Sequence, residues 1–214
     1  MLIFDMDGTM TDSNGIWKDV DIEFLARRGL PYTKEYAEGV AHTIFPLAAV
    51  FTKEYAHLEE STDEIMAEWL EMAGDVYAQD VPVKPGVVAF LDECRARGEK
   101  MVVLTSSVPQ HCRAALGHLG LLPYFEKIYF ANELMMEKKN PEIFLYAARD
   151  MGVRPEDCVM FDDSISACRA AKSAGMQVIG VHDPFFDDTQ IEMRRVCDRY
   201  IMGFEEMLPW NLKN

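Results

Sequence analysis

The sequence predicts an α/β fold in which helices flank a parallel β-sheet and an α-helical cap domain is inserted near the start of the chain. Three observations support this prediction. An apolar strand opens the chain at residues 2–4, apolar residues at helical spacing fill residues 13–82, and strands alternate with helices from residue 84 onward. Such alternation is typical of a parallel sheet covered on both faces. We expect a core domain from residues 1–12 and 83–214 and a cap domain from residues 13–82.

Prolines and glycines mark the ends of the elements in the alternating part of the chain. Proline stands near the first turn of two expected helices, 109–119 and 141–151, and a glycine directly follows each of them. Proline is favoured at the start of a helix and glycine just after its end. The expected elements are helices at 86–97, 109–119, 141–151 and 164–174, and strands at 101–104, 127–130, 158–161 and 176–181.

The inserted segment carries two apolar stripes with helical spacing. They consist of Ile16, Val20, Phe24 and Leu25, and of Ile65, Trp69, Met72 and Val76. We expect a helical lobe above the carboxyl ends of the strands, which is where open parallel sheets bind ligands. Trp17, Phe45 and Phe51 could line a substrate pocket there, but packing inside the cap is the favoured interpretation. Residues 185–188 are interpreted as a loop that opens a surface helix, outside any site.

The composition limits the possible partners. The chain has 214 residues, 49% of them apolar, and a formal net charge of -15. This charge disfavours nucleic acids and anionic membranes as partners. We recognise no signal peptide and no apolar run of membrane-spanning length. The five cysteines are scattered without metal-ligand spacing, so we expect reduced thiols in a cytoplasmic monomer that acts on a small molecule.

Two aspartates directly follow the opening strand. At about 4 Å and an effective dielectric constant of 20, the repulsion between two carboxylates is roughly 4 kcal/mol. A protein tolerates such a pair where a cation, a lysine or a proton offsets it, and such a place is usually a working site. An ordinary turn after a strand is an equally good interpretation of Asp5 and Asp7 alone.

Three further polar clusters follow expected strands or lie between them. They are Thr105-Ser106-Ser107, Asp162-Asp163-Ser164 and the segment 137–141, which contains two lysines. Each cluster alone could simply cap a helix or lie in a solvated loop. Together they bring carboxylates, hydroxyls and a lysine to one edge of one sheet. This set fits phosphoryl transfer, with an attacking carboxylate, a second carboxylate as acid and base, and Mg²⁺ as a hard cation with oxygen ligands.

The four clusters resemble the motifs of the haloacid dehalogenase (HAD) superfamily, in the phosphatase and β-phosphoglucomutase-like branch with a helical cap. The order and spacing of the motifs carry the resemblance, which covers nearly the whole chain. It implies a Rossmann-like sheet with strand order 5-4-1-2-3. The matching segments are Asp5-Met6-Asp7-Gly8-Thr9, Val103-Leu104-Thr105-Ser106-Ser107, Lys138 before Pro141-Glu142-Ile143-Phe144, and Val159-Met160-Phe161-Asp162-Asp163-Ser164.

The resemblance also implies roles for single residues. Asp5 would be the nucleophile and Asp7 the general acid and base. Thr105 and the backbone amide of Ser106 would bind the phosphate, and Lys138 would neutralise its charge. Lys139 stands where a proline is usual, so Lys138 and Lys139 are both candidates for this cation.

The implied metal site consists of carboxylates. Mg²⁺ would be held by Asp5, by the backbone carbonyl of Asp7 and by Asp163, with Asp162 acting through a bound water. Asp7 argues against a dehalogenase, which needs no second aspartate as acid.

The sequence predicts a Mg²⁺-dependent phosphatase that forms an aspartyl phosphate on a small phosphomonoester. The alternative is a β-phosphoglucomutase-like mutase, and a non-enzymatic binding protein is the weakest interpretation. In the mutases, a histidine and two cap cations stand where this chain has Trp17, Glu38 and His42. Loss of these cations favours the phosphatase.

Overall fold

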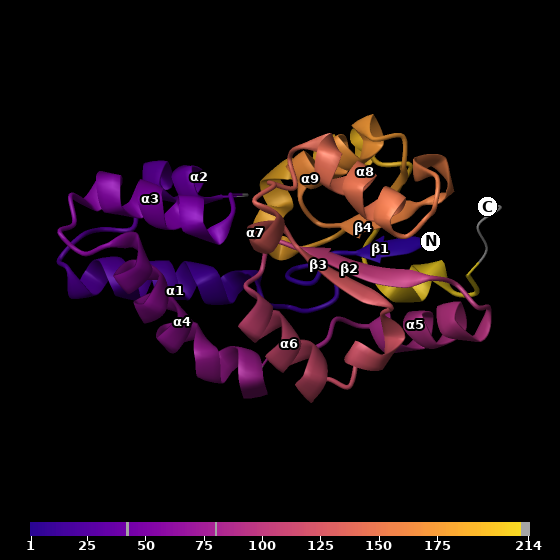
Figure 1. The fold of residues 1–214 in the computed structure, drawn as a ribbon, viewed down its shortest axis with the longest axis horizontal. Coiled ribbons are helices and arrows are strands. Elements are labelled where there is room, and N and C mark those ends of the chain that lie inside the picture. The colour runs from indigo at the N-terminus through magenta and orange to yellow at the C-terminus, as the bar shows by residue number, and fades with distance from the viewer. Residues whose placement is uncertain (42, 80, 211–214) are drawn as a thin grey trace.

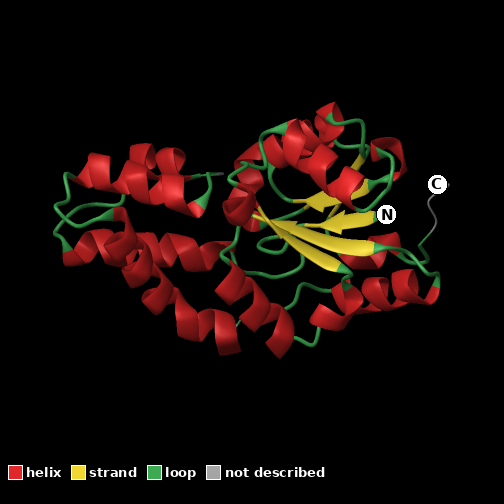
Figure 2. Cartoon of the chain, in the orientation of Figure 1, coloured by secondary structure: helices red, strands yellow, loops and turns green. Residues whose placement is uncertain are grey.

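The computed structural model describes residues 1–41, 43–79 and 81–210 as a sheet-containing core with a helical lobe at one side (Figure 1). The core holds a six-stranded sheet in which all neighbouring strands run parallel, in the order β3-β2-β1-β4-β5-β6 (Figure 2). The strands are β1 (Leu2–Phe4), β2 (Met101–Thr105), β3 (Lys127–Phe130), β4 (Val159–Asp162), β5 (Gln177–Val181) and β6 (Arg199–Ile201).

The predicted fold class is confirmed, and so is the predicted order of five strands. Read from its other edge, the sheet has the order 6-5-4-1-2-3, which contains 5-4-1-2-3 and adds β6. The sequence analysis missed β6 because it has three residues and only Ile201 among them is buried. Such a short segment shows no alternating pattern.

Helices cover both faces of the sheet. Along each strand, successive side chains enter two different apolar clusters, so the strands are buried on both sides. Helices α5 and α6 pack on one face with Phe4 and Phe161, while α8 and α9 pack on the other with Ile3 and Met160 (Figure 1). The helices of the core are α5 (Val87–Ala96), α6 (Pro109–His118), α7 (Ala131–Leu134), α8 (Pro141–Asp150), α9 (Ile165–Ser173) and α10 (Gln190–Val196), with 3₁₀ turns η1 (Leu122–Tyr124), η2 (Pro155–Asp157), η3 (Pro184–Thr189) and η4 (Phe204–Met207).

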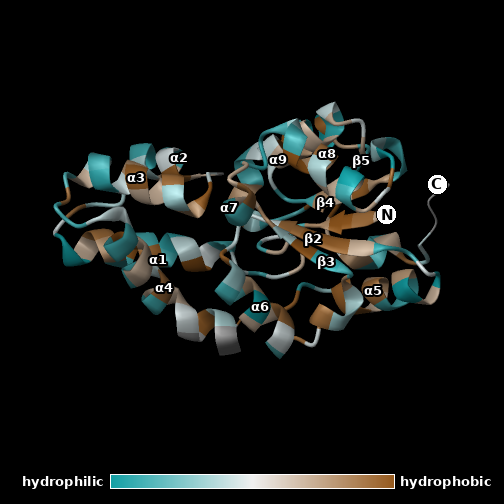
Figure 3. Ribbon diagram, in the orientation of Figure 1, coloured by the Kyte–Doolittle hydropathy of each residue, from teal (hydrophilic) through white to brown (hydrophobic). Residues whose placement is uncertain are grey.

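The lobe consists of α1 (Asn14–Arg27), α2 (Lys34–Val40), α3 (Phe45–Ala56) and α4 (Thr62–Gln79). Its interior is aromatic: the ring of Trp69 lies 5.5 Å from Phe24 and 5.4 Å from Phe45, both edge-on or tilted. Figure 3 shows brown, apolar residues along the strands and on parts of the helices, with teal, polar residues on other helix faces. The domain boundaries at residues 12 and 83 stay a prediction.

The chain leaves and re-enters the core through two paired segments. Thr11 forms an antiparallel bridge with Val83, and the amide of Asp12 donates to the carbonyl of Pro82 at 3.0 Å. The connection to the lobe is therefore a narrow two-stranded neck beside the end of β1. Among the described helices, none has the length and apolar character needed to cross a bilayer.

Candidate active site

Three buried carboxylates and one buried lysine meet at the carboxyl ends of β1 and β4. Asp5 follows β1, Asp162 ends β4, and Asp163 follows it. One oxygen from each of these carboxylates lies within 4.8 Å of the others. The Nζ atom of Lys138 lies 2.9 Å from Oδ1 of Asp5 and 2.6 Å from Oδ2 of Asp162. Four charged groups that no single segment could hold are thus brought together by the sheet.

The charges in this cluster do not balance. Burial raises the pKa of Asp5 to about 6, although Lys138 opposes the shift. Burial, together with the neighbouring Asp162 and Asp5, raises the pKa of Asp163 well above its ordinary value. Burial would lower the pKa of Lys138, but Asp162 and Asp5 raise it, so the lysine stays charged. One ammonium group faces three carboxylates, so a further cation would stabilise the cluster.

The loop after β1 fixes both oxygens of Asp163. Oγ1 of Thr9 donates to Oδ1 at 2.9 Å, and Nδ2 of Asn14 donates to Oδ2 at 2.7 Å. Gly8 allows this approach: its φ is +74°, and a Cβ there would lie 2.2 Å from Asp163 Oδ2. A side chain at position 8 would therefore displace the carboxylate. Asp163 is oriented before any ligand binds.

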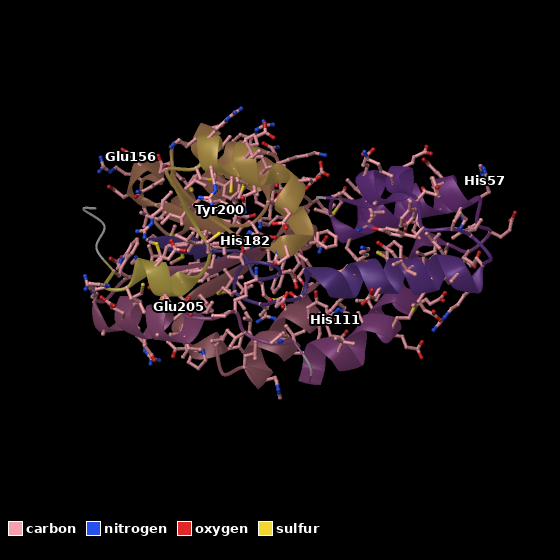
Figure 4. The ribbon with its side chains drawn as sticks, turned by 180° about the vertical axis from the view of Figure 1, so that it is seen from behind. His57, His111, Glu156, His182, Tyr200 and Glu205 are labelled. Carbon is pink, nitrogen blue, oxygen red and sulfur yellow. The ribbon has the colours of Figure 1, made fainter. Side chains whose placement is uncertain are left out.

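Lys84 supports the same loop from the neck. Its Nζ atom, which is largely buried, donates to the carbonyls of Gly8 and His182 and lies 2.6 Å from Oδ2 of Asp183. Figure 4 shows His182, which follows β5, beside Tyr200 of the edge strand β6, and Nδ1 of His182 lies 3.0 Å from the Tyr200 hydroxyl. This lysine joins the first loop, the neck and the segment after β5. The sequence analysis did not identify it, since a single lysine after a proline-rich turn carries no pattern.

Asp7 is held at the neck between the core and the lobe. Its Oδ1 accepts hydrogen bonds from Oγ of Ser13 at 2.5 Å and from the hydroxyl of Tyr77 at 2.6 Å. Ser13 precedes α1 and Tyr77 lies near the end of α4, so both donors flank the neck. Burial raises the pKa of Asp7, and the two donors oppose this shift. The position of this carboxylate therefore depends on where the lobe stands.

A buried histidine supports Tyr77. The ring of His111, on α6, stacks on Tyr77 with centroids 4.9 Å apart and an interplanar angle of 12°, where the lobe meets the core (Figure 4). Burial lowers the pKa of His111, so the imidazole is neutral at pH 7. The ring of Trp17 lies 5.7 Å from the same imidazole. These contacts restrict the Tyr77 ring and hence the direction in which its hydroxyl donates.

The end of β2 carries the hydroxyl side chains of Thr105, Ser106 and Ser107. Thr105 and Ser107 are buried, and Oγ1 of Thr105 accepts a hydrogen bond from the amide of Ser107 at 3.0 Å. Nδ2 of Asn132 donates to the carbonyl of Ser106 at 2.8 Å. Oδ1 of Asn132 accepts from the amide of Phe45 at 2.8 Å, so this loop also contacts the lobe.

The two candidate lysines lie in different places. The Lys138 side chain is only 8% exposed and contacts the carboxylates. The Lys139 side chain is 57% exposed and pairs with Glu137 at 2.9 Å on the surface. Oε1 of Glu137 also accepts a hydrogen bond from Thr43 of the lobe at 2.9 Å. Of the two, only Lys138 can reach an anion bound beside Asp5.

A cleft of about 840 Å³ rises from the carboxylates between the core and the lobe. All the predicted site residues except Asp162 line it: Asp5, Asp7, Thr105, Ser106, Lys138 and Asp163. Trp17 and Phe45 pack against each other in the lobe, as favoured, and they line the cleft as well. Phe185, Phe186 and Asp188 also line it, so the segment 185–188 borders the candidate site, contrary to the expectation. Phe51 does not line it. Further lining residues, none of which was considered for the site from the sequence, are Asn14, Lys18, Asp21, Tyr32, Lys34 and Trp69.

Comparisons with known proteins agree with this geometry. A family profile described as a haloacid dehalogenase-like hydrolase matches residues 1–175. The fructose-1-phosphate phosphatase YqaB of Escherichia coli K12 is 30% identical over 189 residues, which is 84% of this chain and 95% of that protein. The phosphorylated carbohydrates phosphatase of Thermotoga maritima is 27% identical over 83% of this chain and 82% of its own. The structure of a β-phosphoglucomutase from Clostridium difficile superposes with a TM-score of 0.79 at 21% identity, covering 96% of this chain and 92% of that one.

Proposed function

The chain belongs to the haloacid dehalogenase-like hydrolase family as a phosphomonoesterase, and we propose that it is a Mg²⁺-dependent phosphatase that forms an aspartyl phosphate on Asp5. The observation that carries the proposal is the contact of Lys138 with Asp5, at 2.9 Å, beside two further buried carboxylates. An anionic phosphoryl group would be repelled by three carboxylates alone. The lysine and a bound cation make its approach to Asp5 favourable.

The cluster suits a hard divalent cation. Its donors are carboxylate oxygens of Asp5, Asp162 and Asp163, all buried and within 4.8 Å of one another. Mg²⁺ prefers oxygen ligands and often contacts a substrate phosphate directly. Asp5, Asp163 and the carbonyl of Asp7 would hold the ion, with Asp162 acting through water. When bound, Mg²⁺ would neutralise charge on the transferring group.

Asp5 is the proposed nucleophile. Its carboxylate oxygen would attack phosphorus in line, forming a P–O bond to Asp5 while the bond to the alcohol oxygen breaks. Thr105 and the amide of Ser106, at the end of β2, would hold the phosphoryl oxygens. Lys138 would remain charged beside them, because Asp162 and Asp5 raise its pKa. No redox partner or further reactant except water is needed.

Asp7 is the proposed acid and base. It would give a proton to the departing alcohol and then take one from the water that attacks the aspartyl phosphate. Its carboxylate is held by Ser13 and Tyr77 at the neck, 2.5 and 2.6 Å from their hydroxyls. Burial raises the pKa of Asp7, which favours a protonated form able to act as an acid. Closure of the lobe would bring substrate and acid together and exclude water.

A mutase differs from a phosphatase in what the cap must hold. A mutase grips a second phosphate, which requires cations in the cap. Two lysines of the lobe, Lys18 and Lys34, line the cleft, but both are exposed, and Lys34 lies 3.5 Å from Glu38. His42, which the sequence analysis considered at this place, lies outside the described residues. The less exposed charged group in this part of the cleft is the half-buried Asp21, which disfavours a second phosphate and supports the phosphatase.

The experiment follows the covalent intermediate. Asp7→Asn should slow hydrolysis of alkyl phosphates more than of p-nitrophenyl phosphate, because a good leaving group needs little help from an acid. The same variant should accumulate a phosphorylated protein in acid-quenched samples analysed by intact mass. Asp5→Asn should give no such species. Chelator should abolish wild-type activity and Mg²⁺ restore it, whereas full activity in chelator would contradict the metal assignment.

A further inference from the structure

One face of α1 runs along the cleft, away from the carboxylate cluster. Asn14, Trp17, Lys18 and Asp21 line the cleft, and spacings of three and four residues put them on the same face of a helix. Asn14 marks the catalytic end, because its Nδ2 donates to Asp163 at 2.7 Å. Asp21 lies seven residues farther along, and at 1.5 Å per residue that is about 10 Å. This face of α1 therefore extends about 10 Å from Asn14, beside Asp163, to Asp21.

At the far end of this face, the half-buried carboxylate of Asp21 lies against the apolar interior of the lobe. The hydroxyl of Tyr36 donates to Oδ1 of Asp21 at 3.0 Å. Tyr36 is fully buried, and its hydroxyl also lies 2.9 Å from Oγ1 of Thr52, which is fully buried too. Among the described residues, Asp21 has no cationic partner, and its second oxygen has no hydrogen-bond donor. Burial raises the pKa of Asp21 to about 7, although Tyr36 opposes the shift.

A carboxylate in this position destabilises the folded protein unless something else compensates. Packing of the lobe does not require it, since the one internal partner that the described residues give it is the Tyr36 hydroxyl. A free acceptor that lines a cleft is instead available to a ligand. The oxygen opposite Tyr36 can accept a hydrogen bond from a hydroxyl, and it repels a carboxylate or phosphate.

We propose that Asp21 determines specificity by accepting a hydrogen bond from the far hydroxyl of a neutral, six-carbon polyol or sugar monophosphate and by rejecting substrates that are anionic at that end. This inference rests on the proposed function, because it assumes that the phosphoryl group lies beside Asp5. An extended chain advances about 1.2 Å per bond. Eight bonds separate phosphorus from the far hydroxyl of a linear six-carbon ester, or about 10 Å, whereas a three-carbon ester spans about 6 Å and falls short.

Lys18 is the competing charge on this face. Its side chain is exposed, so solvent and salt screen its field, and exposed charges contribute little to binding. Lys34 is exposed as well and lies 3.5 Å from Glu38, which offsets it. Asp21 is the more buried group and its field is screened less. We therefore expect repulsion by Asp21 to outweigh attraction by the lysines at the far end of a substrate.

The test compares two substrates that differ only at their far end. Glucitol 6-phosphate ends in a hydroxymethyl group and 6-phosphogluconate in a carboxylate. The wild type should prefer the first by about 10- to 100-fold in kcat/KM, as expected for a hydrogen bond to a charged group. Asp21→Asn keeps the size but removes the charge, and the ratio should fall to about 3-fold or less. Asp21→Ser, a smaller neutral replacement, should give the same collapse.

Asp19→Asn is the matched control. It removes the same charge from the exposed side of the same helix, and the substrate ratio should not change. Acetyl phosphate has a leaving group too short to reach Asp21, so both Asp21 variants and Asp19→Asn should hydrolyse it at the wild-type rate. An unchanged ratio in both Asp21 variants, or a wild type without preference, would overturn the inference and leave the phosphatase intact. Failure of the wild type to hydrolyse acetyl phosphate with Mg²⁺ would instead reject the proposed function.

Discussion

The two ends of the cleft differ in how their carboxylates are held. At the core end, three carboxylates follow or end strands that lie side by side in the sheet, and Lys138 contacts two of them, Asp5 and Asp162. At the lobe end, Asp21 accepts a hydrogen bond from Tyr36 and forms no ion pair within the described part of the chain. The arrangement at the core end holds the charged groups in one geometry, and movement of a strand end would disrupt that geometry. The arrangement at the lobe end can vary without harm to the chemistry, which suits a group that selects the substrate.

Removal of the proposed nucleophile tests the core end most severely. Asp5→Asn should reduce phosphate release from acetyl phosphate by about 10⁴-fold or more, because an amide cannot take up the phosphoryl group. The melting temperature should be retained or raised, since burial already raises the pKa of Asp5 to about 6 and the variant removes a buried charge. Residual turnover within tenfold of the wild type would show that another group attacks phosphorus.

Lys138 is the next largest expected effect. Lys138→Ala should lower kcat by about 10²-fold or more, as expected for a preorganised cation beside the transferring group. Lys139→Ala is the matched control on the next residue, and it should lower kcat by less than about threefold because its side chain is 57% exposed and pairs with Glu137. Phosphate-release kinetics on both variants decide the assignment, and the reverse ranking would place the third motif one residue later.

The contrast between the two ends also explains what the sequence could predict. Asp5, Asp7 and Asp163 directly follow apolar strands, and parallel strands bring such residues to one edge, so short motifs were sufficient to find them. Strand β6 has one buried residue in three and gave no signal. The donors to Asp7 and Asp163 were harder to predict. Thr9 ends the first motif and Ser13 follows it by four residues, but Tyr77 comes from the far end of the lobe.

Asp21 could not be found in this way, and the aromatic lining was only the less favoured alternative for Trp17 and Phe45. A helix face is defined by three-dimensional neighbours, and the periodicity of α1 alone does not reveal which side meets a cleft. Trp17 and Phe45 have the apolar character of core residues, and packing is the more common outcome for such side chains. They do pack in the lobe, with centroids 5.4 Å apart, and they line the cleft as well.

Tyr77 links the two ends, so it offers an intermediate test. Tyr77→Phe removes a 2.6 Å hydrogen bond to Asp7 but keeps the ring stacked on His111. We expect kcat for alkyl phosphates to fall about tenfold, in line with the loss of a hydrogen bond to a charged group. The loss on p-nitrophenyl phosphate should be smaller, as with Asp7→Asn. Equal losses on both substrates would mean that Tyr77 acts on folding or lobe closure and does not position the acid.

The smallest expected effect concerns stability at the lobe end. Because burial raises the pKa of Asp21 to about 7, the folded protein binds a proton that the unfolded chain, with its ordinary aspartate, releases between about pH 4 and pH 7. The contribution of Asp21 to stability is therefore present at acid pH and is lost as the pH rises through 7. Asp21→Asn should be more stable than the wild type at pH 8, by about 1 kcal/mol, since partial exposure reduces the full effect.

The measurement is urea unfolding of the wild type, Asp21→Asn and Asp19→Asn at pH 5.5 and pH 8. The advantage of Asp21→Asn should grow between the two pH values, while Asp19→Asn should follow the wild type at both. A carboxylate that destabilises the lobe and still improves substrate selection is the pattern of a residue kept for function. If Asp21→Asn were instead less stable at pH 8, the carboxylate would be anchoring Tyr36, and its place in the cleft would be a consequence of folding.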